Sequence, residues 1–441
     1  KMSDEAVYDQ YKFDSYKMLV PGENGWIFRS ENDLRNDFRI DSEALNNLEN
    51  LAAAYKTRGI DLVMLLVPTR GLIHADQLRP EDQKKYGFTN VDAIWNNYGA
   101  AVKSLEDRGI HVISIDRTAA GSDFFYKRDH HWNAKGAKIA AETVAAYIKK
   151  MPAYNDIAKV TYSTLDVEPL DYYGVSKKVF SKLCHTTQPP EPIQKKQTDR
   201  VDEANGGDAL FGDASVPDIV LLGTSNSTPE PSFSNFEGAL KEALSADVLN
   251  MSVSGGGLET AMLSYLNSDY IKKHPAKIAI WEIPGYYNIS TYKTFFREAI
   301  PAVYGDCGDK AVAEAKDFAL DEKISIPLDS LSGEKIAGSD YYLYLNFAKP
   351  IAQSFSVSLQ YKKDRERYKF QRDARYPRDG EFYLNLAKGK SSPLQKVVLS
   401  VGEKAVGTHV DVKICKKSEI QSAGMEPKGM RGVFRKLFDK L

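Results

Sequence analysis

The sequence is poor in cysteine, has almost no net charge and lacks any long apolar run. Its three cysteines, Cys184, Cys307 and Cys415, lie too far apart for the ligand spacing of a zinc site. The 59 basic and 60 acidic residues leave a formal net charge of −1, which gives no overall field to attract nucleic acid. No apolar run approaches the ~18 residues of a membrane-spanning helix. These absences argue against a thiolate metal site, a nucleic-acid partner and a membrane-spanning segment.

The composition is that of an ordinary globular protein. Hydrophobic residues make up 42% and charged residues 27% of the 441 residues. At roughly 100–200 residues per domain, this length predicts two or three domains with room for a sizeable core.

Helical and strand patterns alternate over residues 20–300. Apolar residues at helical spacing predict helices, and short apolar runs predict strands that are buried on both faces. The helices are expected at 42–58, 91–108, 134–149, 234–245 and 257–267, and the strands at 60–67, 110–115, 217–222, 247–251 and 277–283. This alternation predicts an α/β fold with a parallel sheet and helices on both of its faces. We assign residues 1–310 to this domain, with a polar surface insertion at about 185–207.

A second domain is expected at 320–416, where apolar and polar residues begin to alternate. Five runs show the pattern, at 341–347, 355–359, 382–386, 397–401 and 409–414. Five strands joined by polar turns predict a small antiparallel β-sandwich. The remaining residues, 417–441, form a basic tail. We consider two states for its end, 428–441: a solvated tail, or a short amphipathic helix that contacts a membrane surface or a partner.

Candidate catalytic residues are sought just after strands, because ligands of open α/β sheets bind at the carboxyl ends of the strands. Ser225 lies in the run Gly-Thr-Ser-Asn-Ser, which follows the strand at 217–222. A small residue before it permits a sharp turn that exposes the hydroxyl group. The alternative is a serine that only caps the next helix.

The run Asp-His-His-Trp at 129–132 follows the strand at 110–115 and precedes a helix. An imidazole can take the proton of a serine hydroxyl when a carboxylate fixes its tautomer, and Asp129 and His131 supply both groups. The alternatives are a helix-capping turn with solvated histidines, or a pair of metal ligands. Adjacent histidines point in different directions, which argues against chelation of one metal ion by both.

Two further loops follow strands at the same edge of the expected sheet. Glycines at 255–257 follow the strand at 247–251, and glycine lets backbone N–H groups approach an oxyanion closely. Such glycine turns are also common in sheet proteins without this role. Tyr287 follows the strand at 277–283 and is expected near the same site.

Together, the serine loop, the Asp-His-His-Trp turn and the glycine loop resemble the SGNH-hydrolase superfamily. Here Asp and His precede Ser, and this permuted order resembles the periplasmic alginate O-acetyltransferases of the AlgX and AlgJ type. Arg70, in the run Pro-Thr-Arg-Gly, matches that pattern as well. The resemblance implies an SGNH-hydrolase-like sheet in the first domain and a module similar to carbohydrate-binding modules in the second. We expect no cofactor and no metal.

By that resemblance Ser225 is the nucleophile, His131 is the general base and Asp129 orients it. The oxyanion and substrate site would combine the N–H of Ser225 with residues of the surrounding loops. These residues are Asn226, Gly255, Gly256, Tyr287, Arg70 and Trp132. An acetyl group would pass to Ser225 from a small activated ester or from proteins of a membrane acetylation complex, and then to a hydroxyl group of a polysaccharide.

Two other functions remain open. If water instead of a sugar hydroxyl attacks the acyl-enzyme, the same triad makes a carbohydrate acetylesterase. A chain without catalytic activity would be a polysaccharide-binding scaffold of an export complex.

Basic and aromatic residues are interleaved at 361–376 in the second domain. Guanidinium groups pair with carboxylates and aromatic faces stack on sugar rings, so this segment suits an anionic polysaccharide. The residues that we select are Tyr361, Arg365, Arg367 and Arg372. A solvated charged strand face is the alternative, and because acidic residues are mixed in, a neutral glycan such as cellulose fits equally well.

The cysteines bear on the compartment of the protein. Three reduced thiols would suit a cytosolic protein, but Cys307 and Cys415 bracket the strand-rich segment, and a bridge between them would close a loop of ~100 residues. We predict this disulfide, and we expect Cys184 to be unpaired or bonded to an upstream cysteine. A periplasmic or other extracytoplasmic location follows, with a signal peptide upstream of the present sequence.

Overall fold

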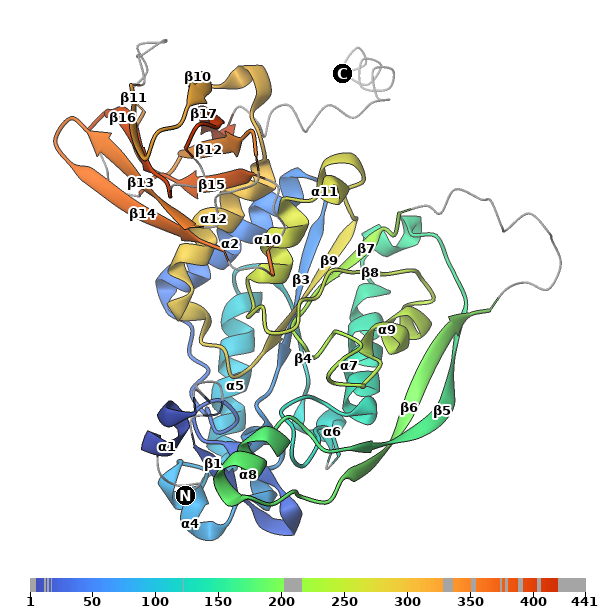
Figure 1. Ribbon diagram of the computed structural model, residues 1–441. Helices are drawn as coiled ribbons and strands as arrows, with labels where there is room; N and C mark the ends of the chain where they lie inside the picture. Colours follow the sequence, from blue (N-terminus) through green and yellow to red (C-terminus); the bar gives the residue numbers. More distant parts are fainter. Residues whose placement is uncertain are drawn as a thin grey trace, which may run out of the picture. The chain divides into compact units, whose positions relative to one another are not determined.

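The computed structural model divides into two compact units (Figure 1). It describes residues 5–11, 13, 16, 18–121, 123–201, 216–327, 336–349, 354–372, 375–376, 380–387, 392–402 and 406–418. The first unit comprises residues 1–52 and 60–293, and the second comprises 53–59 and 294–441. Helix α12 (Lys293–Tyr304) therefore belongs almost wholly to the second unit, whereas the sequence placed the domain boundary near residue 310.

The first unit is built on a five-stranded parallel sheet in the order β4-β3-β9-β7-β8. Its strands are β3 (Asp61–Val67), β4 (His111–Ser114), β7 (Ile219–Leu222), β8 (Leu249–Asn250) and β9 (Ile278–Pro284). Every residue of β7 and of β9 is buried, as expected for parallel strands covered on both faces. The predicted α/β fold is confirmed.

Helices connect these strands as the sequence pattern indicates (Figure 1). The main ones in sequence order are α2 (Ser42–Thr57), α5 (Val91–Glu106), α7 (Ala134–Ile148), α9 (Phe236–Leu244) and α10 (Thr260–Leu266). Local sequence fixes where they begin: the Asn90 side chain caps α5, and the Asn133 side chain accepts a hydrogen bond from the N–H of Gly136 at the start of α7. Helix α7 thus begins directly after the Asp-His-His-Trp run.

A two-stranded antiparallel ribbon was not predicted. It pairs β5 (Tyr162–Tyr172) with β6 (Glu191–Arg200), and β6 lies within the stretch predicted as a surface insertion. The Gln- and Lys-rich sequence of β6 lacks the apolar pattern that predicts a strand, because a ribbon at the surface needs few apolar residues. Smaller elements complete the unit, among them α1 (Glu5–Gln10), β1 (Leu19–Pro21), β2 (Ile27–Arg29), α3 (Arg70–Ile73), α4 (Pro80–Lys85), α6 (Arg117–Ala120), α8 (Lys177–Cys184) and α11 (Asp269–Lys273).

The second unit contains two four-stranded antiparallel sheets, with strand orders β10-β17-β12-β15 and β11-β16-β13-β14. The strands are β10 (Ala313–Ala319), β11 (Lys323–Pro327), β12 (Tyr341–Phe347), β13 (Ser354–Tyr361), β14 (Arg365–Gln371), β15 (Glu381–Asn385), β16 (Leu394–Ser400) and β17 (His409–Lys416). Apolar side chains of both sheets form one core, which confirms the predicted β-sandwich. Strands β10, β11 and β14 were missed, since their sequences are rich in charged or hydroxyl side chains.

The predicted disulfide joins Cys307 to Cys415 in the second unit. The two Cα atoms are 5.8 Å apart, both residues are buried, and Cys184 is a free, half-buried cysteine. The bridge ties the segment before β10 to the end of β17 across a sequence separation of 108 residues.

Removing this bridge is expected to destabilise the second unit. Changing both Cys307 and Cys415 to Ser should lower its free energy of unfolding by ~2–4 kcal/mol, because the unfolded chain regains the freedom of a long loop. Urea unfolding followed by circular dichroism measures the change. Cys184→Ser serves as the matched control and should leave the curve unshifted; equal curves for the double variant and the parent chain would contradict the prediction.

No helix among the described residues has both the length and the apolar character needed to cross a membrane. The tail segment 428–441, for which an amphipathic helix was considered, lies outside the described residues.

Candidate active site

Ser225 lies in the loop that follows the carboxyl end of β7, the strand between β9 and the edge strand β8. Gly223, which precedes it, has no room for a side chain: an added Cβ would lie 2.5 Å from Ser227 Oγ and 2.7 Å from Ser252 Oγ. A larger residue at this position would therefore displace the neighbouring Ser227 or Ser252. Ser225 is partly exposed, whereas Thr224 and Asn226 on either side of it are buried.

Asp129 and His131 lie in a turn that precedes α7. The residues at the two ends of this turn are hydrogen-bonded to each other. Phe125 and Trp132 form an antiparallel bridge, the N–H of Tyr126 donates to the carbonyl of His131 at 3.2 Å, and the N–H of Asn133 donates to that of Phe124 at 3.0 Å. These bonds hold 124–133 as a closed turn, which we call the histidine turn.

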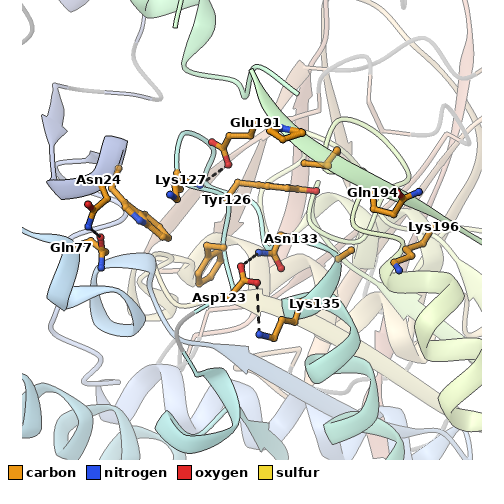
Figure 2. Close-up of a pocket in the computed structure, with 15 residues that line it drawn as sticks. Asn24, Gln77, Asp123, Tyr126, Lys127, Asn133, Lys135, Glu191, Gln194 and Lys196 are labelled. Carbon is orange, nitrogen blue, oxygen red and sulfur yellow. Dashed lines mark hydrogen bonds and ion pairs between the residues drawn. The ribbon is translucent and has the colours of Figure 1, made fainter. Parts of the chain in front are cut away.

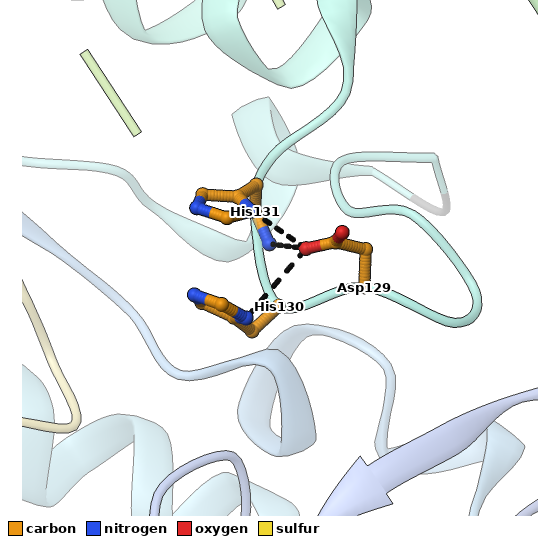
Figure 3. A group of neighbouring side chains, drawn as sticks. All are labelled: Asp129, His130 and His131. Atoms are coloured by element: carbon orange, nitrogen blue, oxygen red, sulfur yellow. Dashed lines mark hydrogen bonds and ion pairs between the residues drawn. The ribbon is translucent and has the colours of Figure 1, made fainter. Parts of the chain in front are cut away.

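The structure brings the three predicted catalytic side chains together although 94 residues separate His131 from Ser225. His131 Nε2 lies 2.8 Å from Ser225 Oγ. On the other side of the ring, His131 Nδ1 lies 2.6 Å from Asp129 Oδ1, which also accepts the backbone N–H of His131 at 3.0 Å. Figure 3 shows the ring held against this carboxylate. With the Nδ1 proton fixed by Asp129, Nε2 is free to accept the serine proton.

Asp129 is buried and is held as an anion. Burial raises its pKa, but the charge of His131 and the hydrogen bonds from His131 and Tyr172 outweigh burial, so the pKa lies well below its usual range. The Tyr172 hydroxyl and the N–H of Val175, at 2.8 Å, both donate to Oδ2. A carboxylate with these donors can stabilise an imidazolium on His131 during a reaction.

His130 is the third member of a group that could in principle bind a metal ion. One ligand atom each from Asp129, His130 and His131 lie within 4.8 Å of one another (Figure 3). However, the His131 Nδ1 and Asp129 Oδ1 atoms face each other, so a metal ion between them would replace the bond that orients the imidazole. Burial and the positive charge of Arg29 hold the pKa of His130 well below its usual value.

Trp132 was predicted at the substrate site, but it lies behind the serine loop. Its side chain is completely buried, and its indole Nε1 donates to the carbonyl of Asn226 at 2.9 Å and to Ser234 Oγ at 3.1 Å. Trp132 thus joins the histidine turn to the serine loop.

Glu282, a fully buried carboxylate on β9, supports the same loop from the neighbouring strand. It accepts the N–H of Thr224 at 2.7 Å, and the Thr224 hydroxyl, the Asn226 amide and the Ser227 hydroxyl at 2.9, 3.1 and 3.2 Å. Burial raises the pKa of Glu282, and these hydrogen bonds oppose the rise. The carboxylate therefore fixes the residues on both sides of Ser225.

The predicted oxyanion donors are not equally available. The Asn226 side-chain amide is bound to Glu282, and the N–H of Gly256 donates to the carbonyl of Val253 at 3.1 Å. Gly255 lies in the turn between Val253 and Gly256, where it is exposed and has a φ of +69°. Among the described residues no acceptor takes the N–H of Ser225, which leaves this group free to bind an oxyanion.

Arg70 and Tyr287 also have places that differ from the expectation. Arg70 is buried and donates to Asp33 Oδ2 at 2.7 Å and to the carbonyl of Ile27. It also donates to the carbonyls of Tyr126 and Lys127, and these two bonds fix the histidine turn. Tyr287 is half-buried, and its ring centroid lies 4.6 Å from that of Tyr286, whose own centroid is 6.5 Å from the His130 ring. Of these two tyrosines, Tyr286 is the one whose ring lies beside that of His130.

The four residues selected for polysaccharide binding fall into two groups. Tyr361 and Arg372 are only 4% and 7% exposed, and Arg372 lies over the ring of Phe382, with 4.0 Å from Cζ to the centroid. These two side chains belong to the core of the second unit and cannot stack on a sugar at its surface. Arg365 and Arg367 are exposed on β14.

Sequence reasoning missed Glu282 and Tyr172, although both contact the site. A glutamate inside the apolar strand at 277–283 is the signal that could have revealed Glu282, because an isolated buried carboxylate must have donors. No comparable signal marks Tyr172, since it belongs to the unpredicted strand β5.

Comparisons with known proteins show the family and the fold. Residues 19–285 match the family model described as "SGNH hydrolase-like domain, acetyltransferase AlgX". The chain is 30% identical over 386 residues to the alginate biosynthesis protein AlgX of Pseudomonas aeruginosa, which covers 87% of this chain and 80% of the relative. It is 31% identical over 290 residues to the probable alginate O-acetylase AlgJ of Pseudomonas fluorescens, covering 62% of this chain and 70% of the relative. A solved structure of Pseudomonas aeruginosa AlgX has a TM-score of 0.81 at 26% identity and covers 94% of this chain and 98% of that one.

Proposed function

The chain belongs to the AlgX family of SGNH hydrolase-like acetyltransferases, and from this premise we propose that it acetylates hydroxyl groups of an exported polysaccharide through an acyl-enzyme on Ser225. The observation that carries the proposal is the continuous chain of hydrogen bonds from Asp129 through His131 to the partly exposed Ser225 hydroxyl.

The first half of the reaction forms the acyl-enzyme. His131 Nε2 takes the proton of Ser225 Oγ as that oxygen attacks the acetyl carbonyl carbon, and the N–H of Ser225 binds the oxyanion. The imidazolium is stabilised by Asp129 and returns the proton to the departing group of the donor. The bond between the acetyl carbon and the donor breaks, and an ester on Ser225 remains.

The second half moves the acetyl group to the sugar. A hydroxyl group of the polysaccharide gives its proton to His131 as its oxygen attacks the ester carbon, and Ser225 leaves with the proton returned by the imidazolium. Water attacking in the same way gives hydrolysis instead. The names of the relatives, an alginate biosynthesis protein and a probable alginate O-acetylase, favour transfer.

The choice between transfer and hydrolysis is tested by one incubation. The chain is mixed with a small activated acetyl ester and an alginate oligosaccharide, and the sugar is analysed by mass spectrometry. We expect acetylated oligosaccharide. Acetate as the sole product would identify an acetylesterase, and no turnover of the ester would favour a binding scaffold.

A basic face on the second unit supports the proposal that the polymer is anionic. Register and burial place Arg365, Arg367 and Lys369 of β14 on the outer face of the sheet, opposite Gln360, Ser358 and Ser356 of β13. Lys396 and Lys323 stand on the same face in β16 and β11. No outward residue of these described strands is acidic, and no described carboxylate pairs with Arg365 or Arg367. We propose that this basic face holds the polymer.

Reversing two of these charges is expected to weaken polymer binding by about 10-fold, since each exposed ion pair contributes up to ~1 kcal/mol. The variant is Arg365→Glu with Arg367→Glu, and calorimetry with an alginate hexasaccharide measures the affinity. The control variant is Lys310→Glu with Lys316→Glu, which changes the charge by the same amount. Lys310 lies just before β10 and Lys316 lies within it, in the other sheet. This variant should bind the hexasaccharide as tightly as the parent chain does. An equal loss in both variants would show an effect of net charge alone.

We also propose a periplasmic or other extracytoplasmic location, where the Cys307–Cys415 disulfide persists. There the acetyl donor is either a small activated ester or a protein of a membrane acetylation complex, and the acceptor is the polysaccharide.

A further inference from the structure

The end of strand β5 and the residues after it close around the carboxylate that orients the catalytic histidine. The Tyr172 hydroxyl and the N–H of Val175 both donate to Asp129 Oδ2, the second of these at 2.8 Å. Between them Gly174, with a φ of +71°, has no room for a side chain, since an added Cβ would lie 2.6 Å from a carbonyl oxygen of the histidine turn. This segment therefore holds the carboxylate oxygen that His131 does not use.

The neighbouring strand of the ribbon holds the same turn at a second point. Tyr172, the last residue of β5, pairs with Glu191, the first residue of β6. The Glu191 carboxylate accepts the backbone N–H groups of Lys127 and Arg128 at 3.2 and 3.0 Å. Figure 2 shows Glu191 directed toward Lys127, where both line an open cavity. One cross-strand pair thus contacts the histidine turn twice, which fixes the Tyr172 side chain relative to Asp129.

Tyr172 is placed to be a constant hydrogen-bond donor to Asp129. Burial and the charge of Asp129 raise the pKa of Tyr172 well above its usual value, so the hydroxyl keeps its proton. The rings of Tyr126 and Phe233 pack against it, with 4.8 and 5.9 Å between centroids. The carbonyl of Pro231 is a second acceptor at 3.2 Å from the hydroxyl. A hydroxyl has one proton, and an anionic carboxylate is a stronger acceptor than a carbonyl, so Asp129 receives it.

We propose that Tyr172 is a positioning residue that controls the basicity of His131 through Asp129. The hydroxyl draws negative charge of the carboxylate toward Oδ2, and less charge then remains at Oδ1 to stabilise an imidazolium. Without this donor, Asp129 would bind the Nδ1 proton more tightly and His131 would become a stronger base. The inference rests on the proposed function for the role of His131 as the general base, and it makes the ribbon one of the elements that tune this base.

Other titratable and charged groups also face this pair, from the N-terminal segment, β2, α3, the histidine turn and β6. They are Tyr16, Arg29, Asp33, Arg70, Tyr126, Arg128, His130 and Glu191. His130 is the imidazole beside His131, with 4.0 Å between the ring centroids. It stays neutral, since burial holds the pKa of His130 well below its usual value. A change at Tyr172 leaves all of these groups in the chain.

The titration of His131 tests the proposal in a chain that does not turn over. Ser225→Ala is prepared with isotope-labelled histidine, and NMR follows the ring nitrogens of His131 against pH, with and without Tyr172→Phe. We expect Tyr172→Phe to raise the titration midpoint by about 0.5–1 pH unit, which corresponds to the loss of one hydrogen bond to the carboxylate. In the chain with Ser225, the acid limb of kcat/KM for a small acetyl ester should move to higher pH by the same amount.

Replacing Tyr172 by 3-fluorotyrosine tests the opposite direction and keeps the hydroxyl in place. Fluorine makes this hydroxyl a stronger donor, so the midpoint should fall below that of the parent chain. Tyr154→Phe is the matched control, because Tyr154 is also buried and its hydroxyl donates to the carbonyl of Leu244 in the same unit. The control should lower the thermal unfolding midpoint as Tyr172→Phe does, and leave the titration of His131 unchanged.

A titration midpoint that stays in place or falls in Tyr172→Phe, or that fails to fall with 3-fluorotyrosine, would overturn the inference. An equal shift in Tyr154→Phe would overturn it as well, since the effect would then come from lost stability. The proposed function is tested separately, by acetylation of Ser225 in the otherwise unchanged chain. The NMR titration needs no turnover, so failure of one is distinguishable from failure of the other.

Discussion

Changing Ser225 to Ala is expected to lower kcat/KM for hydrolysis of a small acetyl ester by about 10⁴-fold or more, because no other group can take over the nucleophilic step. The residual rate would come from the oxyanion donor and from binding alone. Ser225 is partly exposed, and among the described residues its hydroxyl group forms a hydrogen bond only with His131. The free energy of unfolding should therefore change little. Initial rates with a chromogenic acetyl ester measure the effect.

Ser104→Ala provides the matched control for this change. Ser104 lies on α5 and donates only to the carbonyl of Ala101, so the variant should keep the parent rate. If the Ser225 variant kept a rate within a few-fold of the parent chain, the catalytic nucleophile would have to be sought elsewhere.

The second large effect is expected at Glu282, which does not touch the substrate. Glu282→Gln replaces one carboxylate oxygen by an NH2 group, which would face donors such as Thr224 or Asn226 instead of accepting from them. The serine loop must then shift, and a displacement of about 1 Å costs on the order of 100-fold in rate. We expect kcat for the small ester to fall by that amount with KM nearly unchanged, as steady-state kinetics would show.

Because Gln matches Glu in size and removes a buried charge, the variant should remain folded, which thermal unfolding can verify. The control is Glu106→Gln on the exposed side of α5, where no described residue donates a hydrogen bond to its carboxylate. An unchanged kcat in a folded Glu282→Gln chain would show that the serine loop does not depend on this carboxylate.

The parallel sheet could be predicted from the sequence, and so could the part of the sheet where the three catalytic candidates lie. Buried parallel strands are continuous apolar runs, and β3, β7 and β9 show this pattern. Polar residues that follow such runs fall at one edge of the sheet. Ser225 closely follows β7, and Asp129 and His131 stand before a helix start marked by the Asn133 cap, which made them candidates. The resemblance to the SGNH-hydrolase superfamily then joined them into one triad.

The supporting residues were less accessible, because their roles depend on pairings that the sequence does not mark. Tyr172 reaches Asp129 only through the ribbon of β5 and β6, whose exposed strands lack an apolar pattern. Tyr361 and Arg372 looked like surface ligands because they lie beside basic residues. In the fold, however, Tyr361 has the inward orientation at the end of β13, and Arg372 is buried against Phe382.

The most direct test of the account is to look for the acetyl group on the enzyme itself. The chain is mixed with a small activated acetyl ester, quenched in acid within the first turnovers, digested and analysed by mass spectrometry. We predict a mass increase of one acetyl group on the peptide that contains Ser225, lost when an alginate oligosaccharide is added before the quench and absent in the His131→Ala variant. Turnover of the ester with the acetyl group on another residue, or with no acetylated peptide in a quench fast enough to resolve single turnovers, would contradict the assignment of Ser225.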